Sequence, residues 1–459
     1  MIIRHPIMRS HSSIISLTVS LCLAVALLPK HAQAAYAPLT FRYTHFVFEI
    51  DPDDYPAWRS SEESWLYFGE PFLPPGDLRV DGDVLPSLPQ GVSRSSNFTW
   101  DLGAIRSTLE LQIARLLDRE PGSVTIRRDG DNILFEGVGL SGRRVDLAEA
   151  AQLTAEAMRR GILDITLPVA EIQPQMNVLD AELQDQGIRE VVAVGESDYR
   201  GSPLARTHNI ATGLDRFNGH IVPQGALFSF NEVLGPVNAS TGYKKELVIQ
   251  GDKTVPDYGG GLCQISTTAY RGVWEYGFPI RERVNHSYSV RYYFPEGTDA
   301  TIYPPYKDVQ FFNDSPGDLL IQTYSEDGRA YFIYYGTRDK REAEVMGPYV
   351  WGKVAPPADR IEQTTDIAPG TSRKVGERVP GLKAGWLRVV YGADGETEEE
   401  LFYSTYEARP RYTQLGVTEE ELHPPDPVPE PVQQEVKKEE EPSARPSWFK
   451  RWRRRHYQL

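Results

Sequence analysis

Residues 258–270 read YGGGLCQISTTAY, and the rest of the chain is organised around this stretch. Three glycines, Gly259–Gly261, come directly before a segment that predicts a helix through Tyr276. Glycine allows backbone conformations that other residues rarely adopt, and the first N–H groups of the helix stay uncovered. Cys263 then lies at the positive end of the helix dipole, which favours thiolate over thiol. The stretch therefore predicts a nucleophile beside backbone donors for an oxyanion.

The N-terminal residues have the pattern of an export signal. A basic start and an apolar run at 13–28 precede Ala32-Gln33-Ala34, which fits a signal-peptidase site, and an uncleaved anchor is the alternative. Cleavage after Ala34 removes three cations and no acid, which changes the net charge from −15 to −18. The sequence therefore predicts an extracytoplasmic protein, secreted or held in the cell envelope. So acidic a chain makes a general role with nucleic acid unexpected.

The chain has two cysteines, Cys22 and Cys263, and the first lies in the predicted signal peptide. The mature form would keep Cys263 alone, so it has no internal disulfide. Such a lone cysteine is either a buried bystander or a reactive thiol. It also argues against a structural zinc site, which uses several Cys or His ligands. We predict neither a metal nor a cofactor.

The composition predicts a β-rich α+β fold with several domains. The central domain is expected to be an antiparallel sheet with a helix that carries the cysteine at its N-terminus. The predicted segments are a signal peptide at 1–34, a β-rich segment at 35–95, an α+β module at 96–182, the main domain at 190–340, a small β-rich module at 350–417, and a Pro/Glu-rich linker with a basic tail at 418–459.

Local patterns predict several individual elements. Residues 39–50 alternate like a strand, and Asp129-Gly130-Asp131 marks a hairpin turn. Asp146 is a predicted N-cap of a helix that ends before Gly161. Another helix face is predicted from Leu102, Ile105, Leu109, Ile113 and Leu116. Further strands are predicted at 287–294, 300–304, 308–314, 319–326 and 330–336, and as a pair across Asp394-Gly395.

Three histidines of the main domain are candidates for the base that serves Cys263. His220 follows a glycine in a turn and is expected to be exposed, and His208 beside a helix start is expected to pack or cap. His286 follows the cysteine by one helix and one turn, at the entrance to a predicted strand. A cysteine at a helix N-terminus and a histidine on an adjoining strand make a workable thiol-enzyme geometry. His45, in another segment, is expected to be a strand histidine and not a ligand.

The base needs a third group to orient it. Asp299, after the turn at Gly297, is the candidate for this role, and Asn285 and Tyr288 are the alternatives. The predicted oxyanion and substrate-binding residues are Gly260, Gly261, Gln264, Ser266 and Tyr288.

Two other interpretations of the stretch stay open. Ser266 or Thr267 is an alternative nucleophile, although neither has the turn signature of a serine hydrolase. Cys263 is otherwise a small buried apolar residue in a structural turn.

The run from about 197 to 335 resembles the VanW domain. The similar pieces are SDYRGSPLARTHNI, VPQGALFSFNEVLGPVNASTGYKKELVI, YGGGLCQISTTAY, NHSYSV and GTDATIYPPYKDVQFFND. Residues 97–180 are similar to a peptidoglycan-binding module that often precedes this domain, and residues 350–417 to a divergent form of a glycine-containing β module that often follows it. The resemblance implies a link to glycopeptide (vancomycin) resistance and, for some members, L,D-transpeptidase activity. It maps the nucleophile, histidine and aspartate onto Cys263, His286 and Asp299.

The resemblance and the residues together favour an L,D-transpeptidase that acts on peptidoglycan stem tetrapeptides through a thioester. The alternatives are a non-catalytic wall-binding or resistance accessory protein, and a cysteine amidase or peptidase acting on wall peptides. The basic end WFKRWRRRHYQL (448–459) suits an anionic wall polymer or membrane surface, and a solvated tail is the alternative.

Overall fold

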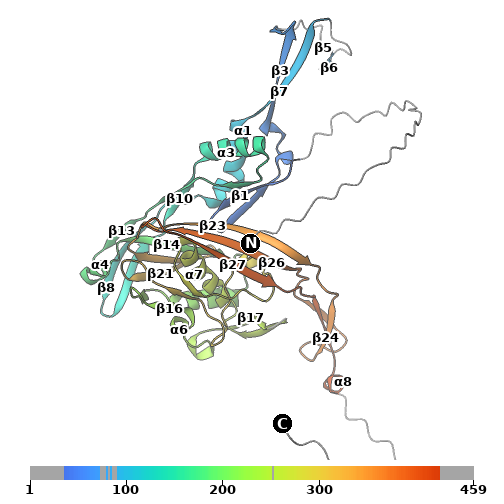
Figure 1. Ribbon diagram of the computed structural model, residues 1–459. Coiled ribbons are helices and arrows are strands. Elements are labelled where there is room, and N and C mark those ends of the chain that lie inside the picture. Colours follow the sequence, from blue (N-terminus) through green and yellow to red (C-terminus); the bar gives the residue numbers. More distant parts are fainter. Residues whose placement is uncertain (1–35, 73–78, 81–82, 85–89, 251–252, 424–459) are drawn as a thin grey trace, which may run out of the picture. The chain divides into compact units, whose positions relative to one another are not determined.

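The computed structural model describes residues 36–72, 79–80, 83–84, 90–250 and 253–423. One compact unit contains the described residues up to Ala355 together with Pro380–Ala408, and a second contains Pro356–Val379 and the described residues from Arg409. Strands predominate, and the longer helices belong to the first unit (Figure 1). The prediction of a β-rich fold with helices is confirmed. The predicted signal peptide, most of the linker and the basic tail lie outside the described residues.

A small sheet and a layer of helices form the N-terminal part of the first unit. Strands β1 (Leu39–Tyr43) and β2 (Phe46–Ile50) form a hairpin, and β11 (Asp164–Thr166) pairs with β1 in parallel. The prediction of one strand at 39–50 is therefore wrong. The chain reverses at Thr44, whose φ of 47° lies in the left-handed region.

The helices of this layer follow the predicted periodicity. α1 (Leu102–Leu109), η4 (Glu110–Ala114) and α2 (Arg115–Leu117) run on from one another, and α3 (Leu147–Arg160) packs beside them. The Asp146 side chain accepts hydrogen bonds from two N–H groups of the first turn of α3, and Gly161 ends the helix with a φ of 68°. On the first helical stretch, the inner predicted residues are buried, whereas Leu102 and Leu116 at its two ends are exposed.

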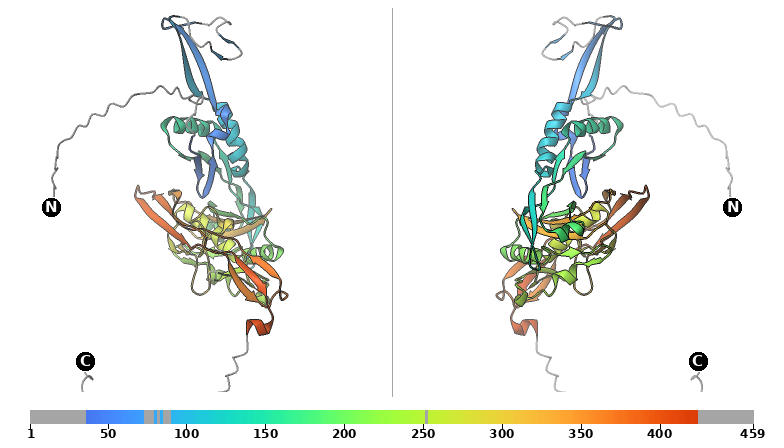
Figure 2. Two further views of the ribbon diagram at one scale, coloured as in Figure 1. Left: turned by 90° about the vertical axis from the view of Figure 1, so that its right-hand side faces the viewer. Right: turned by 90° about the vertical axis from the view of Figure 1, so that its left-hand side faces the viewer.

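Hairpins extend this N-terminal part. β3 (Arg59–Tyr67) and β7 (Val92–Trp100) form a long hairpin that leads into α1 (Figure 2). The sheet β13-β8-β9 includes the predicted turn at Asp129. The remaining elements are η1 (Pro52–Asp54), η2 (Pro56–Trp58), β4 (Glu70–Pro71), β5 (Arg79–Val80), β6 (Asp83–Val84), β8 (Ser123–Asp129), β9 (Asn132–Val138), β10 (Gly142–Val145), β12 (Val169–Ile172), β13 (Gln175–Val178) and α4 (Ala181–Asp185).

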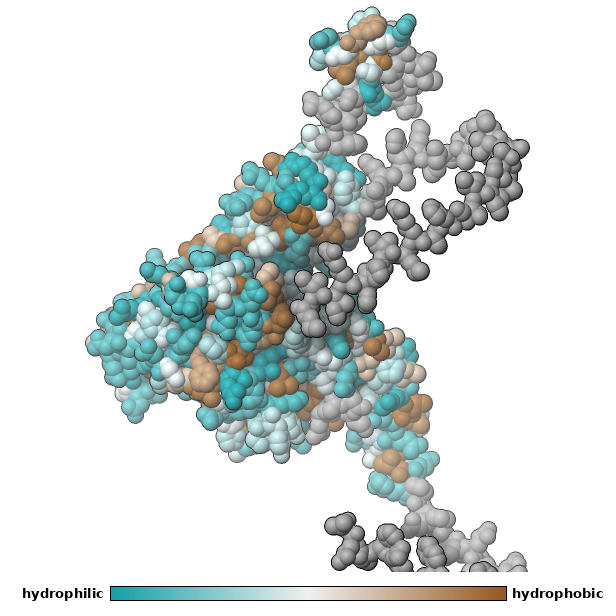
Figure 3. Space-filling model, in the orientation of Figure 1, coloured by the Kyte–Doolittle hydropathy of each residue, from teal (hydrophilic) through white to brown (hydrophobic). Residues whose placement is uncertain are grey.

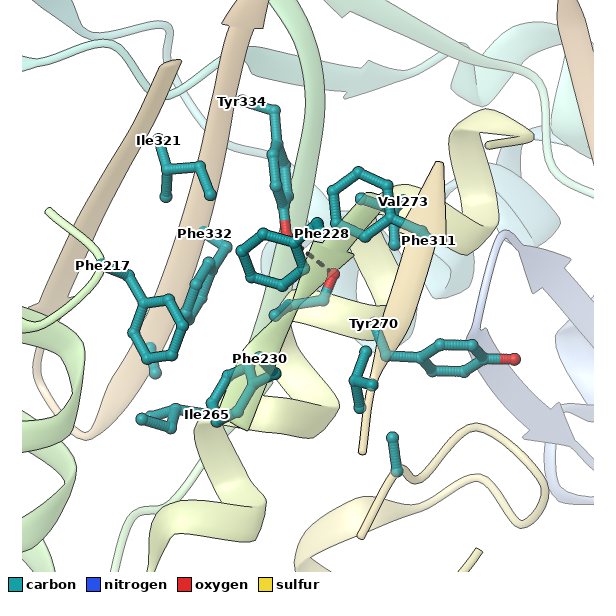
Figure 4. Close-up of a cluster of buried hydrophobic side chains, with 14 of the residues drawn as sticks. Phe217, Phe228, Phe230, Ile265, Tyr270, Val273, Phe311, Ile321, Phe332 and Tyr334 are labelled. Atoms are coloured by element: carbon teal, nitrogen blue, oxygen red, sulfur yellow. Dashed lines mark hydrogen bonds between the residues drawn. The ribbon is translucent and has the colours of Figure 1, made fainter. Parts of the chain in front are cut away.

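An antiparallel sheet in the order β14-β22-β21-β15 forms the centre of the first unit. Its strands are β14 (Glu190–Asp198), β15 (Ile221–Val222), β21 (Leu319–Glu326) and β22 (Arg329–Gly336), and it packs against helices α5 (Leu204–Asp215) and α7 (Leu262–Tyr276). Figure 4 shows the aromatic core between them, where the Tyr334 hydroxyl donates to the Ala269 carbonyl of α7 at 3.0 Å. A Cβ on Gly195 of β14 would lie 1.9 Å from the Thr268 carbonyl oxygen. The glycine therefore lets α7 lie directly on the sheet.

Shorter elements surround α7. They are α6 (Phe230–Leu234), η5 (Ala239–Thr241), η6 (Arg291–Tyr293), the sheet of β16 (Leu227–Ser229), β20 (Gln310–Phe312) and β19 (Ile280–Glu282), and the hairpin of β17 (Lys245–Gln250) and β18 (Lys253–Tyr258).

Two strands predicted for this region are absent from the described residues. Residues 287–294 form a loop with the η6 turn, because Tyr293 turns inward and packs on His286. Residues 300–304 form a loop that is bound to α7 through Thr267, with an isolated bridge between Tyr303 and Lys307.

The last part of the first unit is the sheet β23-β26-β27, formed by Glu342–Val354, Gly381–Tyr391 and Thr397–Tyr406. The pairing of β26 and β27 across Asp394-Gly395 confirms the predicted hairpin. One face of this sheet is buried, and its Trp386 ring packs edge-on against Trp274 of α7 at 5.4 Å between centroids. This sheet therefore belongs to the same core as the helix that carries the cysteine.

The second unit is small. It contains the sheet of β24 (Arg360–Thr364), β28 (Tyr412–Gly416) and β25 (Ser372–Val375), followed by α8 (Glu419–Leu422). Asp359 pairs there with Arg378 and Arg411. No helix in the described ranges is both long and apolar enough to cross a membrane. The surface in Figure 3 is mainly hydrophilic, with hydrophobic residues in scattered groups.

Candidate active site

The glycine run places Cys263 in the first turn of α7. The Leu262 N–H donates to the Gly259 carbonyl at 3.0 Å, and the helix begins at Leu262. Gly261 has a φ of 116°, and a Cβ at this position would lie 3.0 Å from Arg206 Cγ. Only glycine fits here without strain. Cys263 is a free thiol and is partly exposed.

Asn209 of α5 holds the glycine loop in place through the hydrogen bonds of its side-chain amide. Its fully buried side-chain amide donates to the Lys244 and Gly260 carbonyls, both at 3.0 Å, and its oxygen accepts from the Lys244 N–H at 2.8 Å. Sequence reasoning missed this residue. It directly follows His208, and in this segment only the histidine was considered for the site.

His286 and Asp299 lie together beside Cys263. His286 Nδ1 lies 2.6 Å from Asp299 Oδ2, which also accepts from the His286 backbone N–H at 2.7 Å. Both side chains are almost fully buried. The carboxylate therefore fixes the tautomer in which Nδ1 carries a proton, and Nε2 faces away from it. Nε2 is buried and has no hydrogen-bond partner in the described part of the chain.

The electrostatics of the three residues are coupled. Burial alone would raise the pKa of the Cys263 thiol, but the neighbouring His286 and the Thr301 hydroxyl outweigh it and lower the pKa to about 7. Burial alone would lower the pKa of His286, but Asp299 and the thiol raise it to about 9. Burial opposes ionisation of Asp299, but His286 and Arg283 hold its pKa well below the usual range. The two residues therefore favour the thiolate and the imidazolium together.

Polar residues of α7 hold the aspartate segment against the cysteine. The Ser266 hydroxyl donates to the Ala300 carbonyl at 2.7 Å, and the Thr267 hydroxyl accepts from the Ala300 N–H at 3.0 Å. Both side chains are fully buried. The Thr301 hydroxyl then lies 3.4 Å from Cys263 Sγ. These contacts give Ser266 and Thr267 a positioning role in the fold of the site.

The predicted oxyanion residues lie on both sides of the thiol. The Gln264 side chain is fully buried and accepts from Arg206 at 2.8 Å, and its backbone N–H donates to the Gly261 carbonyl at 2.9 Å. The Gly260 carbonyl is held by the buried asparagine described above. The Cys263 N–H has no partner among the described residues. It is therefore the N–H group of the first turn that is available to an oxyanion next to Sγ.

The alternatives for the third group lie near the site with other partners. The Tyr288 hydroxyl is 3.4 Å from Thr254 Oγ1 of β18. Asn285 donates to the His286 carbonyl at 2.7 Å and to the Thr405 carbonyl at 2.9 Å, so it holds the backbone and not the imidazole.

The other histidines considered in the sequence analysis have other partners or surroundings. His208 Nε2 lies 2.9 Å from the Gly242 carbonyl oxygen. His220 is partly buried, and burial lowers its pKa. His45 is buried in the β1–β2 turn and not within a strand as predicted, and its Nδ1 pairs with Glu275 of α7.

Three further side chains enclose the histidine and aspartate, and sequence reasoning missed them. The Tyr293 ring stacks on the His286 imidazole, with 4.5 Å between centroids and 17° between planes. Arg283 Nη2 lies 3.1 Å from Asp299 Oδ1, and the Tyr406 hydroxyl donates to the same oxygen. Tyr406 lies 107 residues after Asp299, so no local pattern could have indicated the contact.

Comparison with known proteins supports part of the resemblance. The profile of the family described as "VanW like protein" matches residues 205–335, which include Cys263, His286 and Asp299. A protein of Bacillus subtilis (strain 168) named "Uncharacterized protein YoaR" is 30% identical over 167 residues. That region is 36% of this chain and 55% of the relative, so the chain spans about half the length of the curated relative it matches. The modules suggested for 97–180 and 350–417 stay predictions.

Proposed function

Because residues 205–335 of this chain are a VanW-like domain, we propose that the protein is a cell-wall enzyme, a cysteine L,D-transpeptidase. The observation that carries the proposal is the arrangement at the start of α7, where the buried His286–Asp299 pair and the Thr301 hydroxyl lie beside the Cys263 thiol and lower its pKa. A thiol in a purely structural turn needs no buried histidine–aspartate pair beside it.

The first half of the proposed reaction forms a thioester. The Cys263 thiolate attacks the carbonyl carbon of the diaminoacyl residue of a stem tetrapeptide, and the Cys263 N–H stabilises the oxyanion. As the C–N bond breaks, the proton of the His286 imidazolium passes from Nε2 to the nitrogen of the departing D-alanine. Asp299 keeps the ring oriented throughout by accepting from Nδ1.

The second half transfers the acyl group. An amine of a neighbouring stem attacks the thioester carbonyl, His286 Nε2 takes the proton that this amine loses, and the thiolate leaves. Water in place of the amine gives hydrolysis, which makes the same site an amidase or peptidase. We propose that the reaction takes place outside the cytoplasm, because the substrate is there and because the first 34 residues have the pattern of an export signal.

Intact-mass spectrometry of the protein incubated with disaccharide tetrapeptide tests this proposal. The wild type is expected to form an adduct that Cys263→Ala does not form, with release of D-alanine. Cross-linked dimer indicates transfer, and free tripeptide indicates hydrolysis. If the wild type forms no adduct and no product, and its thiol resists alkylation until the protein unfolds, the activity is refuted and a wall-binding role is favoured.

A further inference from the structure

The end of strand β27 is attached to the segment that carries His286 and Asp299. The Arg283 guanidinium donates to the Ser404 hydroxyl at 2.8 Å, and the Glu407 N–H donates to the Ser287 carbonyl at 2.7 Å. Next to β27, the Trp386 indole of β26 donates to the Glu296 carbonyl at 2.8 Å. The residues around the candidate catalytic pair are therefore fixed by a sheet that lies beyond the family match, which ends at residue 335.

Tyr406 is the contact of this sheet that reaches the aspartate itself. The residue is 4% exposed, and its hydroxyl oxygen accepts from the Gly297 N–H at 2.8 Å. The hydroxyl has one hydrogen, which it donates to Asp299 Oδ1. The two oxygens of Asp299 are thus held from different directions, Oδ1 by Tyr406 and Arg283 and Oδ2 by His286. A carboxylate held at both oxygens cannot rotate away from the imidazole.

We propose that Tyr406 is a positioning residue of the active site, which fixes Asp299 so that Oδ2 stays on His286 and the imidazole keeps its place beside the Cys263 thiol. The active site is then composite: the VanW-like domain supplies the thiol, the imidazole and the carboxylate, and β27 supplies the phenol that holds the carboxylate. This inference rests on the proposed catalytic roles of Cys263, His286 and Asp299. It does not depend on which peptide is the substrate.

The test measures the rate of Cys263 alkylation by iodoacetamide against pH for the full chain and for Tyr406→Phe. This readout needs no wall peptide, so it separates failure of the inference from failure of the proposed activity. Tyr406→Phe keeps the ring and removes the hydroxyl. We expect the pH midpoint of alkylation to rise and the rate at pH 7 to fall about tenfold, as expected for a lost hydrogen bond to a charged group.

Tyr403→Phe is the matched control, because Tyr403 lies on the same strand and is 62% exposed. It is expected to react like the wild type. A Tyr406→Phe protein that melts like the wild type and keeps its midpoint and rate would overturn the inference. A midpoint of Tyr406→Phe shifted to lower pH would also overturn it. Such a shift would mean that the phenol draws negative charge from Asp299 and does not hold it in place.

Incorporation of 3-fluorotyrosine covers the case in which Tyr406→Phe does not fold. The fluorinated phenol is a stronger donor of nearly the same size. At position 406 it is expected to shift the NMR resonance of the His286 Nδ1 proton, and at position 403 to leave it unchanged. An unchanged resonance at both positions would show that Tyr406 does not act on the His286–Asp299 pair.

Discussion

His286 Nδ1 lies 2.6 Å from Asp299 Oδ2, and the opposite ring nitrogen is buried without a hydrogen-bond partner in the described residues. A buried polar atom with no partner is costly, so a histidine that keeps one normally has a further use for it. The imidazole lies beside Cys263, which carries the only thiol of the described residues, and the two groups favour each other's charged form. The site therefore favours an ion pair of the Cys263 thiolate and the His286 imidazolium, which the proposed reaction uses.

The reactivity of Cys263 should follow pH with a midpoint of about 7. Only the thiolate is alkylated, so the rate rises as pH increases through the pKa of the thiol. In His286→Ala the largest lowering influence is lost, while burial still raises the pKa and the Thr301 hydroxyl still lowers it, so the midpoint should rise clearly above 7. Stopped-flow alkylation measures both. A midpoint of the variant that stays near 7 would show that the imidazole does not activate the thiol.

Much of this site could be predicted from the sequence because its signals are local. A glycine run before a helix indicates the position of Cys263, and His286 is the histidine that follows this helix by one turn, at the entrance to a predicted strand. The strand predicted after His286 was wrong, because alternation in SYSVRYYF does not show that Tyr293 folds back onto the imidazole. Contacts such as that of Tyr406 join segments more than a hundred residues apart. They depend on how sheets pack, which no local pattern contains.

Replacement of Asn209 by alanine should loosen the loop before α7. The change removes the donor of the buried Gly260 carbonyl and of the part-buried Lys244 carbonyl, and an unsatisfied buried group costs about 1–3 kcal/mol. Urea unfolding should therefore show a loss in that range or above it, and alkylation of Cys263 should slow.

Asn218→Ala is the control for this change, because Asn218 is exposed and accepts a single hydrogen bond, from the Thr323 N–H at 3.1 Å. Equal effects of the two substitutions would contradict the role of Asn209 in fixing the glycine loop.

Gly261→Ala should damage both stability and reactivity. A side chain at a φ of 116° is strained, and its Cβ would lie 3.0 Å from Arg206 Cγ. The strain alone costs about 1–3 kcal/mol. Gly201→Ala provides the comparison, because Gly201 has a φ of 77° and open space around it. Differential scanning calorimetry should show the larger loss for Gly261→Ala, and only this variant should change the alkylation of Cys263. A larger loss at Gly201 would show that the close contact with Arg206 is unimportant.

The buried Glu196 should make the protein sensitive to acid. Its carboxylate pairs with Arg119 at 2.6 Å and with Arg143 at 2.8 Å. Burial opposes its ionisation, but these arginines prevail and lower the pKa from 4.5 to about 2. Because the pKa is lower in the folded state, the stabilisation is complete above pH 4.5 and is lost as pH falls toward 2. The shift corresponds to about 3 kcal/mol at neutral pH.

Glu196→Gln should therefore be less stable than the wild type at pH 7, and thermal melting should show the gap narrowing below pH 4.5. Glu136→Gln is the matched control, because its pair with Arg127 is 3.0 Å long but largely exposed. Exposed pairs contribute about 0–1 kcal/mol, so this variant should melt like the wild type throughout. If the Glu196→Gln gap stayed constant from pH 7 to pH 3, the loss would come from packing, and the charge of Glu196 would not be what stabilises this part of the fold.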